Sequence, residues 1–179
     1  MTILGISGSL RHDSHNTMLL RNVPLELELW QGLKEIPPYD EDDDVEPAPP
    51  AVAQMRAAVA GADAILFATP EYNASIPGQL KNAVDWLSRP RATSALRNKP
   101  VAVVGASIGA FGAVWAQAEL RKVLATAGAR VIEGDVAVGH AHERFDSNGV
   151  LTDESLLEQL HEVVDALVAE VATREQIAA

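Results

Sequence analysis

Two continuous apolar segments constrain the fold of this 179-residue chain more than any other feature. They are Ala64–Thr69 (AILFAT) and Val101–Val104 (VAVV), and each is followed by a loop rich in small and polar residues and then by a helical pattern. A strand that is hydrophobic on both faces is typical of the middle of a parallel sheet, where helices cover both sides. We therefore expect a parallel sheet with helical crossovers.

The remaining segments extend the alternation of strands and helices over the whole chain. Further strands are expected at Thr2–Ser7, at Leu25–Trp30, whose strict alternation with glutamates on one face suits a sheet edge, and at Val131–Val138. Helices are expected from Ser14 to before Pro24, from Pro47 to Ala60 and from Pro77 to Leu87. A further helix follows the loop at 105–112 and ends at about Ala127, and a last one runs from Thr152 or Asp153 to about Val171. The pattern predicts one α/β domain over residues 1–179. We expect a three-layer α/β/α sandwich with a five-stranded parallel sheet in the flavodoxin-like order 2-1-3-4-5.

This strand order also predicts where a ligand binds. In such sheets, ligands lie outside the carboxyl ends of strands one and three. The loops at those positions are residues 7–16 and 69–78, and the loop at 105–112 lies beside them. Gly, Ser, Asn, Arg and Tyr are concentrated in the same three loops. Composition and topology therefore indicate one site at this edge of the sheet.

The first loop has the side chains of an anion site. Ser9, Arg11, Ser14 and Asn16 can all donate hydrogen bonds, and Arg11 has a permanent positive charge. The loop lacks both Gly-x-Gly-x-x-Gly and the lysine of a P-loop, so a terminal monophosphate fits it better than a dinucleotide. His15 is included among the cofactor-binding candidates, where it would moderate the negative field, although a surface role fits it equally well. The alternative for the whole loop is a polar turn with ordinary helix caps.

The second loop supplies a surface for a flat ring. Pro70-Glu71-Tyr72-Asn73 offers rigid backbone groups and one aromatic ring, which can border a planar heterocycle. An ordinary strand-to-helix loop is the alternative. A monophosphate site beside a site for a planar ring points to FMN as the cofactor.

Three motifs resemble the NADPH-dependent FMN reductases of the flavodoxin-like fold, a family that includes bacterial quinone, chromate and azo-dye reductases. The motifs are Gly8-Ser9-Leu10-Arg11-x-x-Ser14-x-Asn16, then Pro70-Glu71-Tyr72-Asn73-x-Ser75-x-Pro77-Gly78-x-Leu80-Lys81-Asn82-Ala83-x-Asp85-Trp86, and a glycine-rich loop before Gln117-x-x-Leu120-Arg121. The second motif is long and highly specific, and together the motifs extend over nearly the whole chain. The stretch from Asn16 to the second strand is shorter than is usual in the family.

The resemblance implies a function and a set of site residues. FMN would accept hydride from NADPH or NADH and pass it to a quinone, flavin, azo or metal-oxyanion acceptor, with ping-pong kinetics. No side chain is expected to act as acid or base. Ser107, Gly109 and Gly112 would close the second flank of the flavin, opposite Pro70–Asn73. Family members form dimers or tetramers, which makes the Pro77–Leu87 helix, with an exposed-looking Trp86, the expected contact between subunits.

Composition excludes several classes of partner. The net charge is −11, and nucleic-acid binding needs a basic face, so nucleic acid is not expected. There is no apolar run near 18 residues, no basic leader and no cysteine, so we expect a cytoplasmic protein without a membrane span, disulfides or thiolate metal sites. The acidic run Asp40–Asp44 and the pair His140 and His142 are interpreted as solvated side chains, with no bound metal.

Two other functions remain alternatives at this point. A flavodoxin-type electron carrier suits the acidic charge, although its phosphate loop is usually rich in threonine. A serine hydrolase suits Gly105-Ala106-Ser107-Ile108-Gly109, which matches G-x-S-x-G after a strand, with Asp135 and His140 following in the order of a catalytic triad. The sequence identifies neither the acceptor nor a preference between NADPH and NADH.

Overall fold

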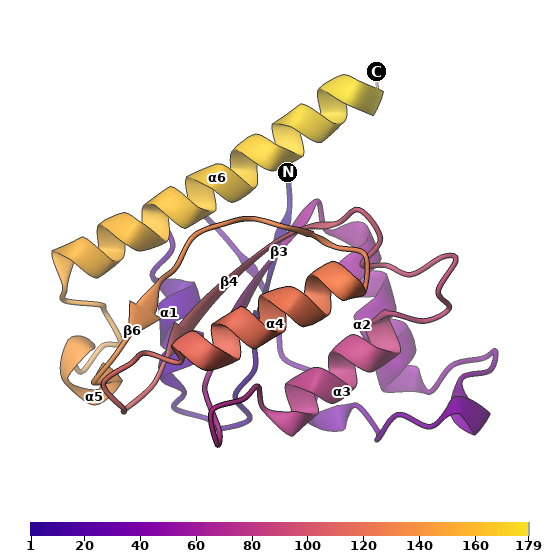
Figure 1. Ribbon diagram of the computed structural model, residues 1–179, viewed down its shortest axis with the longest axis horizontal. Coiled ribbons are helices and arrows are strands. Elements are labelled where there is room, and N and C mark those ends of the chain that lie inside the picture. Colours follow the sequence, from indigo (N-terminus) through magenta and orange to yellow (C-terminus); the bar gives the residue numbers. More distant parts are fainter. Residues whose placement is uncertain (179) are drawn as a thin grey trace.

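The computed structural model describes residues 1–178, with side chains described through Thr173 (Figure 1). Its sheet contains β1 (Ile3–Ser7), β2 (Glu28–Trp30), β3 (Ala64–Thr69), β4 (Pro100–Ala106), β5 (Arg130–Val131) and β6 (Ala137–Val138). The strand order is β2-β1-β3-β4-β5, β6 also pairs with β4, and all pairs are parallel. The predicted flavodoxin-like order is confirmed, with β2 at one edge.

Helices cover both faces of the sheet. The helices α2 (Pro50–Gly61), α3 (Gly78–Leu87) and α4 (Val114–Thr126) lie on one face, and α1 (His15–Arg21) and α6 (Glu154–Ala178) lie on the other. The sequence of the central strand β3 is apolar throughout because both of its faces are buried. Ile65 and Phe67 pack in the core under α2–α4, while Leu66 and Ala68 pack in the core under α1 and α6.

The last predicted strand is interrupted, which corrects the expectation of one strand over Val131–Val138. Two short strands, β5 and β6, pair with the two ends of β4. Between them, the Arg121 guanidinium donates to the carbonyl oxygens of Val103, at 3.1 Å, and Gly134, at 2.6 Å. The side chain thus replaces the backbone ladder locally, and Gly134 adopts a φ of +140° there.

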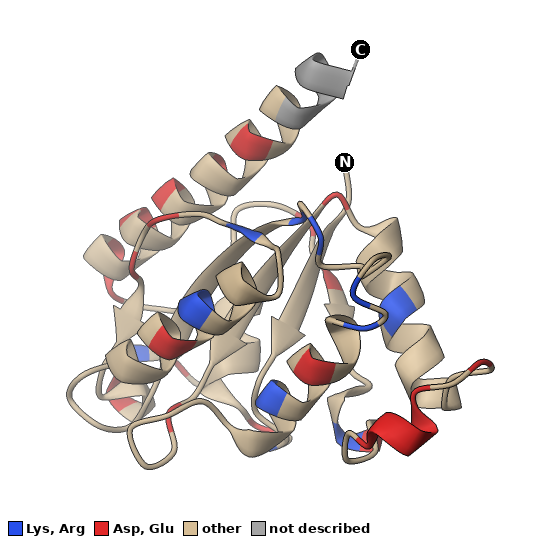
Figure 2. Cartoon of the chain, turned by 45° about the vertical axis from the view of Figure 1, so that its right-hand side comes forward, with Lys and Arg blue, Asp and Glu red and all other residues tan. Residues whose placement is uncertain are grey.

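Smaller departures occur in the connecting segments. The predicted polar loop after β6 contains a short helix, α5 (Ala141–Arg144), and α6 extends beyond the predicted end near Val171. The acidic run Asp40–Asp44 contains a single 3₁₀ turn, Glu41–Asp43, at the surface (Figure 2). Asp44 at its end forms an ion pair with Arg56 at 2.9 Å. No helix within residues 1–178 is long and apolar enough to cross a membrane.

Trp86 lies in the core and not on the surface, so its expected role as an exposed contact between subunits is wrong. Its side chain is fully buried, and the indole N–H donates to the carbonyl oxygen of Pro37 at 2.9 Å. The Tyr39 ring packs edge-on against the indole, with 4.9 Å between the ring centroids. The Arg56 guanidinium lies over the indole, 5.7 Å from its centroid. Trp86 follows the charged Asp85 in the sequence, but its position on the helix faces α2 and the segment before α2.

Candidate functional site

The first loop is held against the neighbouring strands by backbone contacts. The Gly8 N–H donates to the carbonyl oxygen of Ala68 in β3 at 2.8 Å. A Cβ atom at Gly8 would lie 2.7 Å from the end of the Leu80 side chain of α3, so any larger residue would have to displace that buried side chain. The loop after β1 is therefore fixed beside the loop after β3.

Asn16 joins the first and third loops from inside the protein. Its amide nitrogen donates to the carbonyl oxygen of Ala106 and its amide oxygen accepts from the Ala106 N–H, both at 2.9 Å, and the side chain is buried. Both polar atoms thus bond the end of β4. This geometry gives Asn16 a positioning role in place of the direct phosphate contact expected from the sequence.

A cavity of about 370 Å³ opens between the first loop and the segment after β2. Three of the predicted phosphate ligands, Ser9, Arg11 and Ser14, line it together. Ser14 is the N-cap of α1, and its hydroxyl oxygen accepts from the Asn16 N–H at 3.2 Å, so the hydroxyl proton remains to be donated. Both interpretations of Ser14, as a cap and as a ligand, are therefore compatible.

The same cavity includes residues that the sequence interpretation missed. Arg21 at the end of α1 and Lys34 after β2 add two positive charges to that of Arg11, and Trp30 and Gln31 also line the cavity. The predicted strand order could have identified the residues that follow β2 as part of this cavity. Because β2 is the parallel neighbour of β1, the carboxyl end of β2 must lie beside the first loop.

His15 lies at the edge of this loop. Its ring nitrogen Nδ1 is 3.3 Å from a guanidinium nitrogen of Arg11. The imidazole ring stacks on the Phe145 ring, with 5.7 Å between the two ring centroids. Partial burial, the Arg11 charge and His142 together hold the pKa of His15 below its ordinary value. His12, by contrast, points outward and pairs with Asp13 at 2.9 Å.

The second loop is a tight turn with an exposed aromatic ring. Tyr72 and Ser75 exchange two backbone hydrogen bonds, at 3.0 and 3.1 Å, across Asn73 and Ala74, whose φ angles are 55° and 59°. Two consecutive residues with positive φ are typical of a type I′ turn, for which asparagine is well suited. Pro70 is buried at the base of the loop, and the Tyr72 side chain is exposed.

Glu71 faces α4 and not the open side of the loop. Its carboxylate oxygen Oε2 accepts from the backbone N–H groups of Trp115 and Ala116, both at 3.0 Å. These are N–H groups of the first turn of a helix, which have no partner within the helix. Glu71 therefore ties the second loop to the start of α4.

The third loop contains two glycines in different surroundings: Gly112 packs against the backbone of β6, and Gly109 is exposed to solvent. Gly112 has a φ of +56°, and a Cβ atom there would lie 2.3 Å from the Ala137 backbone of β6. Gly109 is exposed, and its N–H donates to the Ser107 hydroxyl at 3.1 Å. Ser107 and Gly109 can thus face a ligand, whereas Gly112 shapes the loop.

The three residues of the hydrolase alternative do not form a triad among the described side chains. Asp135 pairs with Arg121 at 2.7 Å, and the His140 ring lies beside that of His142 at 6.4 Å. The Ser107 hydroxyl has Gly109 as its partner. A nucleophilic serine needs a base within hydrogen-bond reach, so this alternative has no geometric support. Within the described part of the chain, no three acidic or histidine side chains gather as a metal site.

Comparison with known proteins identifies the family. The model of the family described as NADPH-dependent FMN reductase matches residues 1–143. The chain belongs to this family. It is 41% identical over 172 residues to the NAD(P)H-dependent FMN reductase of Pseudomonas aeruginosa, covering 92% of each protein. It is also 34% identical over 180 residues to the 2-hydroxy-1,4-benzoquinone reductase of a Burkholderia species, covering 97% of this chain and 98% of the relative.

A solved structure agrees with this assignment. The flavoenzyme NAD(P)H:acceptor oxidoreductase FerB from Paracoccus denitrificans superposes with a TM-score of 0.83 at 34% identity, over 96% of this chain and 97% of FerB. The expected family and fold are confirmed. This member of the FMN reductase family is thus an NAD(P)H-dependent flavin oxidoreductase of the FMN reductase and quinone reductase type.

Proposed function

We propose that this reductase binds FMN with the phosphate in the cavity beside the first loop. The main support for this proposal is that Ser9, Arg11 and Ser14 line one cavity of about 370 Å³ at the carboxyl end of β1. Hydroxyls and a guanidinium are the donors that a phosphate monoester prefers. Arg21 and Lys34 also line this cavity, and so do the carboxylates of Asp13 and Glu35, so three cations against two carboxylates leave a small net positive charge that favours an anion.

The proposed ring site lies between the second and third loops. The exposed Tyr72 and the rigid turn at Asn73 border one flank, and Ser107 with the exposed Gly109 borders the other. Glu71 and Asn16 hold these loops at fixed positions. When bound, FMN supplies the hydride chemistry, and the protein supplies binding and orientation.

The proposed reaction uses one exposed face for two substrates in turn. NADPH or NADH is the reductant, and a quinone is the proposed acceptor class, which the benzoquinone reductase relative supports. Because both substrates occupy the same face, we expect ping-pong kinetics. We also propose a single flavin-binding domain over residues 1–179 and assembly into a homodimer or homotetramer.

A visible spectrum of the purified protein, followed by anaerobic titration with NADPH and NADH, tests the function. We expect flavin absorption that is bleached by either nucleotide and restored by a quinone. A flavodoxin-type carrier would keep its colour until a separate reductase was added. A colourless protein that fails to bind added FMN would refute the cofactor assignment.

The double variant R11A/S14A tests the phosphate assignment. Loss of a charged and a neutral donor to the phosphate should weaken FMN binding by about a hundredfold or more, so the variant should lose flavin during purification. R97A, which removes an exposed arginine outside this cavity, is the matched control and should retain flavin. Full flavin content in R11A/S14A would place the phosphate elsewhere.

A further inference from the structure

The second loop is attached to α4 at two points, one on each arm of its turn. On the first arm, the Glu71 carboxylate accepts from two N–H groups in the first turn of α4. On the second arm, the Ser75 hydroxyl donates to the carboxylate oxygen Oε2 of Glu119 at 2.6 Å, and the Ile76 N–H makes a longer bond to the same oxygen, at 3.4 Å. The loop thus supplies the acceptor at one point, and α4 supplies it at the other.

The spacing of the two attachment points fixes the direction of the turn. Glu71 bonds the N–H groups of Trp115 and Ala116, and Glu119 lies one helical turn further along α4. Residues four apart in a helix lie on the same face, about 6 Å apart along the axis. One contact would let the turn pivot about it, whereas two contacts on one face hold both arms at once.

The segment between the two arms contains the residues that border the proposed ring site. The Tyr72 side chain is 53% exposed, and Asn73 and Ala74 both have positive φ angles. Alanine rarely adopts this left-handed conformation, and such a residue persists where the surrounding structure holds it. The two contacts with α4, one of them through Glu119, give the turn that support.

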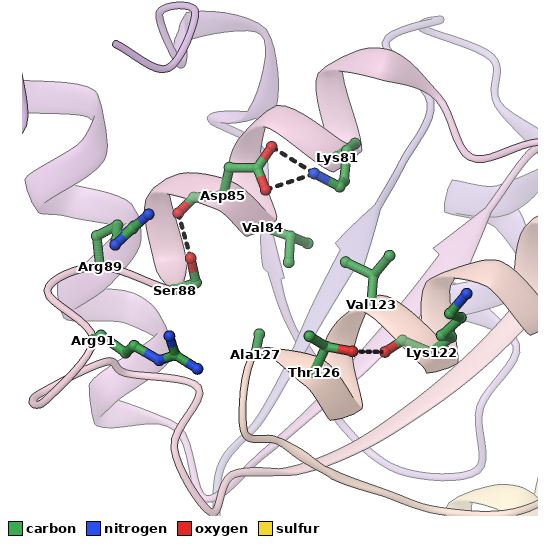
Figure 3. Close-up of a pocket in the computed structure, with 10 residues that line it drawn as sticks. All are labelled: Lys81, Val84, Asp85, Ser88, Arg89, Arg91, Lys122, Val123, Thr126 and Ala127. Carbon is green, nitrogen blue, oxygen red and sulfur yellow. Dashed lines mark hydrogen bonds and ion pairs between the residues drawn. The ribbon is translucent and has the colours of Figure 1, made fainter. Parts of the chain in front are cut away.

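A surface ion pair does not account for Glu119, although its side chain is exposed. Among the side chains that the structure describes, no lysine or arginine lies within ion-pair distance of this carboxylate. Lys122, which follows Glu119 by three residues, lines a cavity of about 340 Å³ between α3 and α4. Figure 3 shows that Lys81, on the facing helix, is bonded to Asp85 of its own helix. The contacts of Glu119 are therefore those with the second loop.

We propose that Glu119 is a positioning residue for the flavin reaction. It holds the Tyr72–Ser75 turn in the direction that places the Tyr72 ring beside the flavin, and it acts through Ser75 without touching the flavin. This role rests on the proposed FMN site and deepens it. A hydrogen bond to a carboxylate is stronger than one between neutral groups, so this one side chain can keep an exposed turn in place.

Amide hydrogen exchange of the flavin-free protein tests the attachment by itself. In E119A we expect the Ser75 and Ile76 amides to exchange at least about tenfold faster, because the turn opens more readily. Alanine suits an exposed helical position, so the exchange of the core strands should stay unchanged. E158A, which removes an exposed glutamate of α6 on the other face of the sheet, is the matched control and should leave the turn unaffected.

Measurements on the FMN-loaded protein test the effect on the reaction. E119A should keep its flavin, because the proposed phosphate site lies in the first loop, but the visible circular dichroism of the flavin should change. We expect kcat/KM to fall at least about fivefold for NADH and for a quinone alike, because misplacement of a positioning group by about 1 Å can cost up to about a hundredfold in rate. Both values should fall, since both substrates use the face that the turn borders.

Two further variants show whether the hydrogen bond is responsible. The side-chain amide oxygen in E119Q can still accept from the Ser75 hydroxyl, so this variant should keep most of the activity. Loss of negative charge alone would affect E119Q and E119A equally. S75A removes the donor and should have the effect of E119A, with no further loss in the double variant S75A/E119A.

The results that would overturn this role differ from those that would overturn the proposed function. Unchanged exchange or unchanged kcat/KM in E119A, equal losses in E119Q and E119A, or additive losses in S75A/E119A would each overturn the role of Glu119. A change of assembly in E119A, measured by sedimentation velocity, would also do so, because it would assign Glu119 to a contact between copies of the chain. In all these cases, flavin that NADH still bleaches would leave the proposed function standing. A protein that binds no FMN would overturn both, and the exchange data would still decide the attachment.

Discussion

Asn16 stabilises the junction of two loops through a single buried side chain. Its two hydrogen bonds satisfy both the N–H and the carbonyl of Ala106, a buried residue of the central sheet. A buried backbone group without a partner costs about 1–3 kcal/mol. The residue therefore contributes both to stability and to the relative position of the first and third loops.

N16A should destabilise the flavin-free protein by about 2 kcal/mol, which lowers the melting temperature by roughly 4–8 °C in a chain of this size. N148A, which truncates an exposed asparagine, is the control and should stay within about 0.5 kcal/mol. Urea unfolding followed by circular dichroism measures both. An N16A variant as stable as the control would show that the bonds to Ala106 contribute little.

His15 should make the stability of the flavin-free protein depend on pH. The folded state lowers its pKa, chiefly by burial and then by the Arg11 charge and His142. The unfolded chain therefore binds the proton more readily, and stability falls as the pH is lowered through the ordinary range of histidine. In H15Q this part of the decline should be absent.

Urea midpoints between about pH 7.5 and pH 5.5 measure this effect. H161Q, which changes a histidine on the exposed side of α6, should keep the His15 contribution. Bound phosphate should act in the opposite direction, because a nearby anion favours the imidazolium. FMN affinity should then rise as the pH falls, and H15Q should flatten that rise.

At the scale of elements, the loop after β4 must pass close to β6. The left-handed conformation of Gly112 and its contact with Ala137 permit this approach. Gly139 has a similar role from the other side, since a Cβ atom there would lie 2.2 Å from the Ala110 carbonyl oxygen. The third loop is thus shaped by a strand that follows it by some 25 residues in sequence.

G112A should destabilise the protein by about 3 kcal/mol, because the methyl group meets backbone atoms and φ is positive. G109A is the matched control in the same loop. Its Cβ atom would meet only the Ser107 hydroxyl, at 3.5 Å, so we expect a change within about 1 kcal/mol. Chemical denaturation compares the two, and similar losses in both would contradict the role assigned to Gly112.

For the whole molecule, the distribution of charge is uneven. Seven of the 14 Lys and Arg residues line the two cavities, one beside the first loop and one between α3 and α4. Figure 2 shows acidic residues spread over the helices and the 3₁₀ turn. The cations beside the first loop outnumber the carboxylates there, so this acidic protein has a local attraction for the proposed FMN phosphate.

The exposed apolar residues of the third loop and α4 form the surface through which we propose that copies of the chain meet. Ile108, Phe111 and Trp115 are 68%, 63% and 49% exposed, and the two aromatic rings contact each other at 5.0 Å. Clustered exposed apolar side chains are typical of interaction sites. With Trp86 buried, this surface replaces it as the proposed contact between copies of the chain.

F111S/W115S should shift the assembly toward the monomer while leaving the fold intact, as measured by sedimentation velocity and circular dichroism. W86A should act differently. Truncation of a fully buried tryptophan costs about 3–5 kcal/mol, so this variant should unfold at lower denaturant concentration. An unchanged assembly in F111S/W115S would exclude this surface as the contact.

The sequence by itself determined the alternation of strands and helices, the parallel sheet with its order, and the edge at which the ligand loops gather. These follow from local patterns: apolar runs, proline and glycine at helix ends, and the short connections that limit topology. The same patterns identified Ser9, Arg11 and Ser14, which share one loop and so lie together in any fold of that type.

Only the tertiary structure decided the direction in which individual side chains point. Asn16 reaches Ala106, Glu71 reaches the start of α4, Trp86 turns into the core, and Arg121 interrupts the last strand. The partner of Asn16 is 90 residues away and that of Trp86 is 49 residues away. No local pattern encodes such contacts, because each depends on the packing of elements that are distant in sequence and meet only in the folded protein.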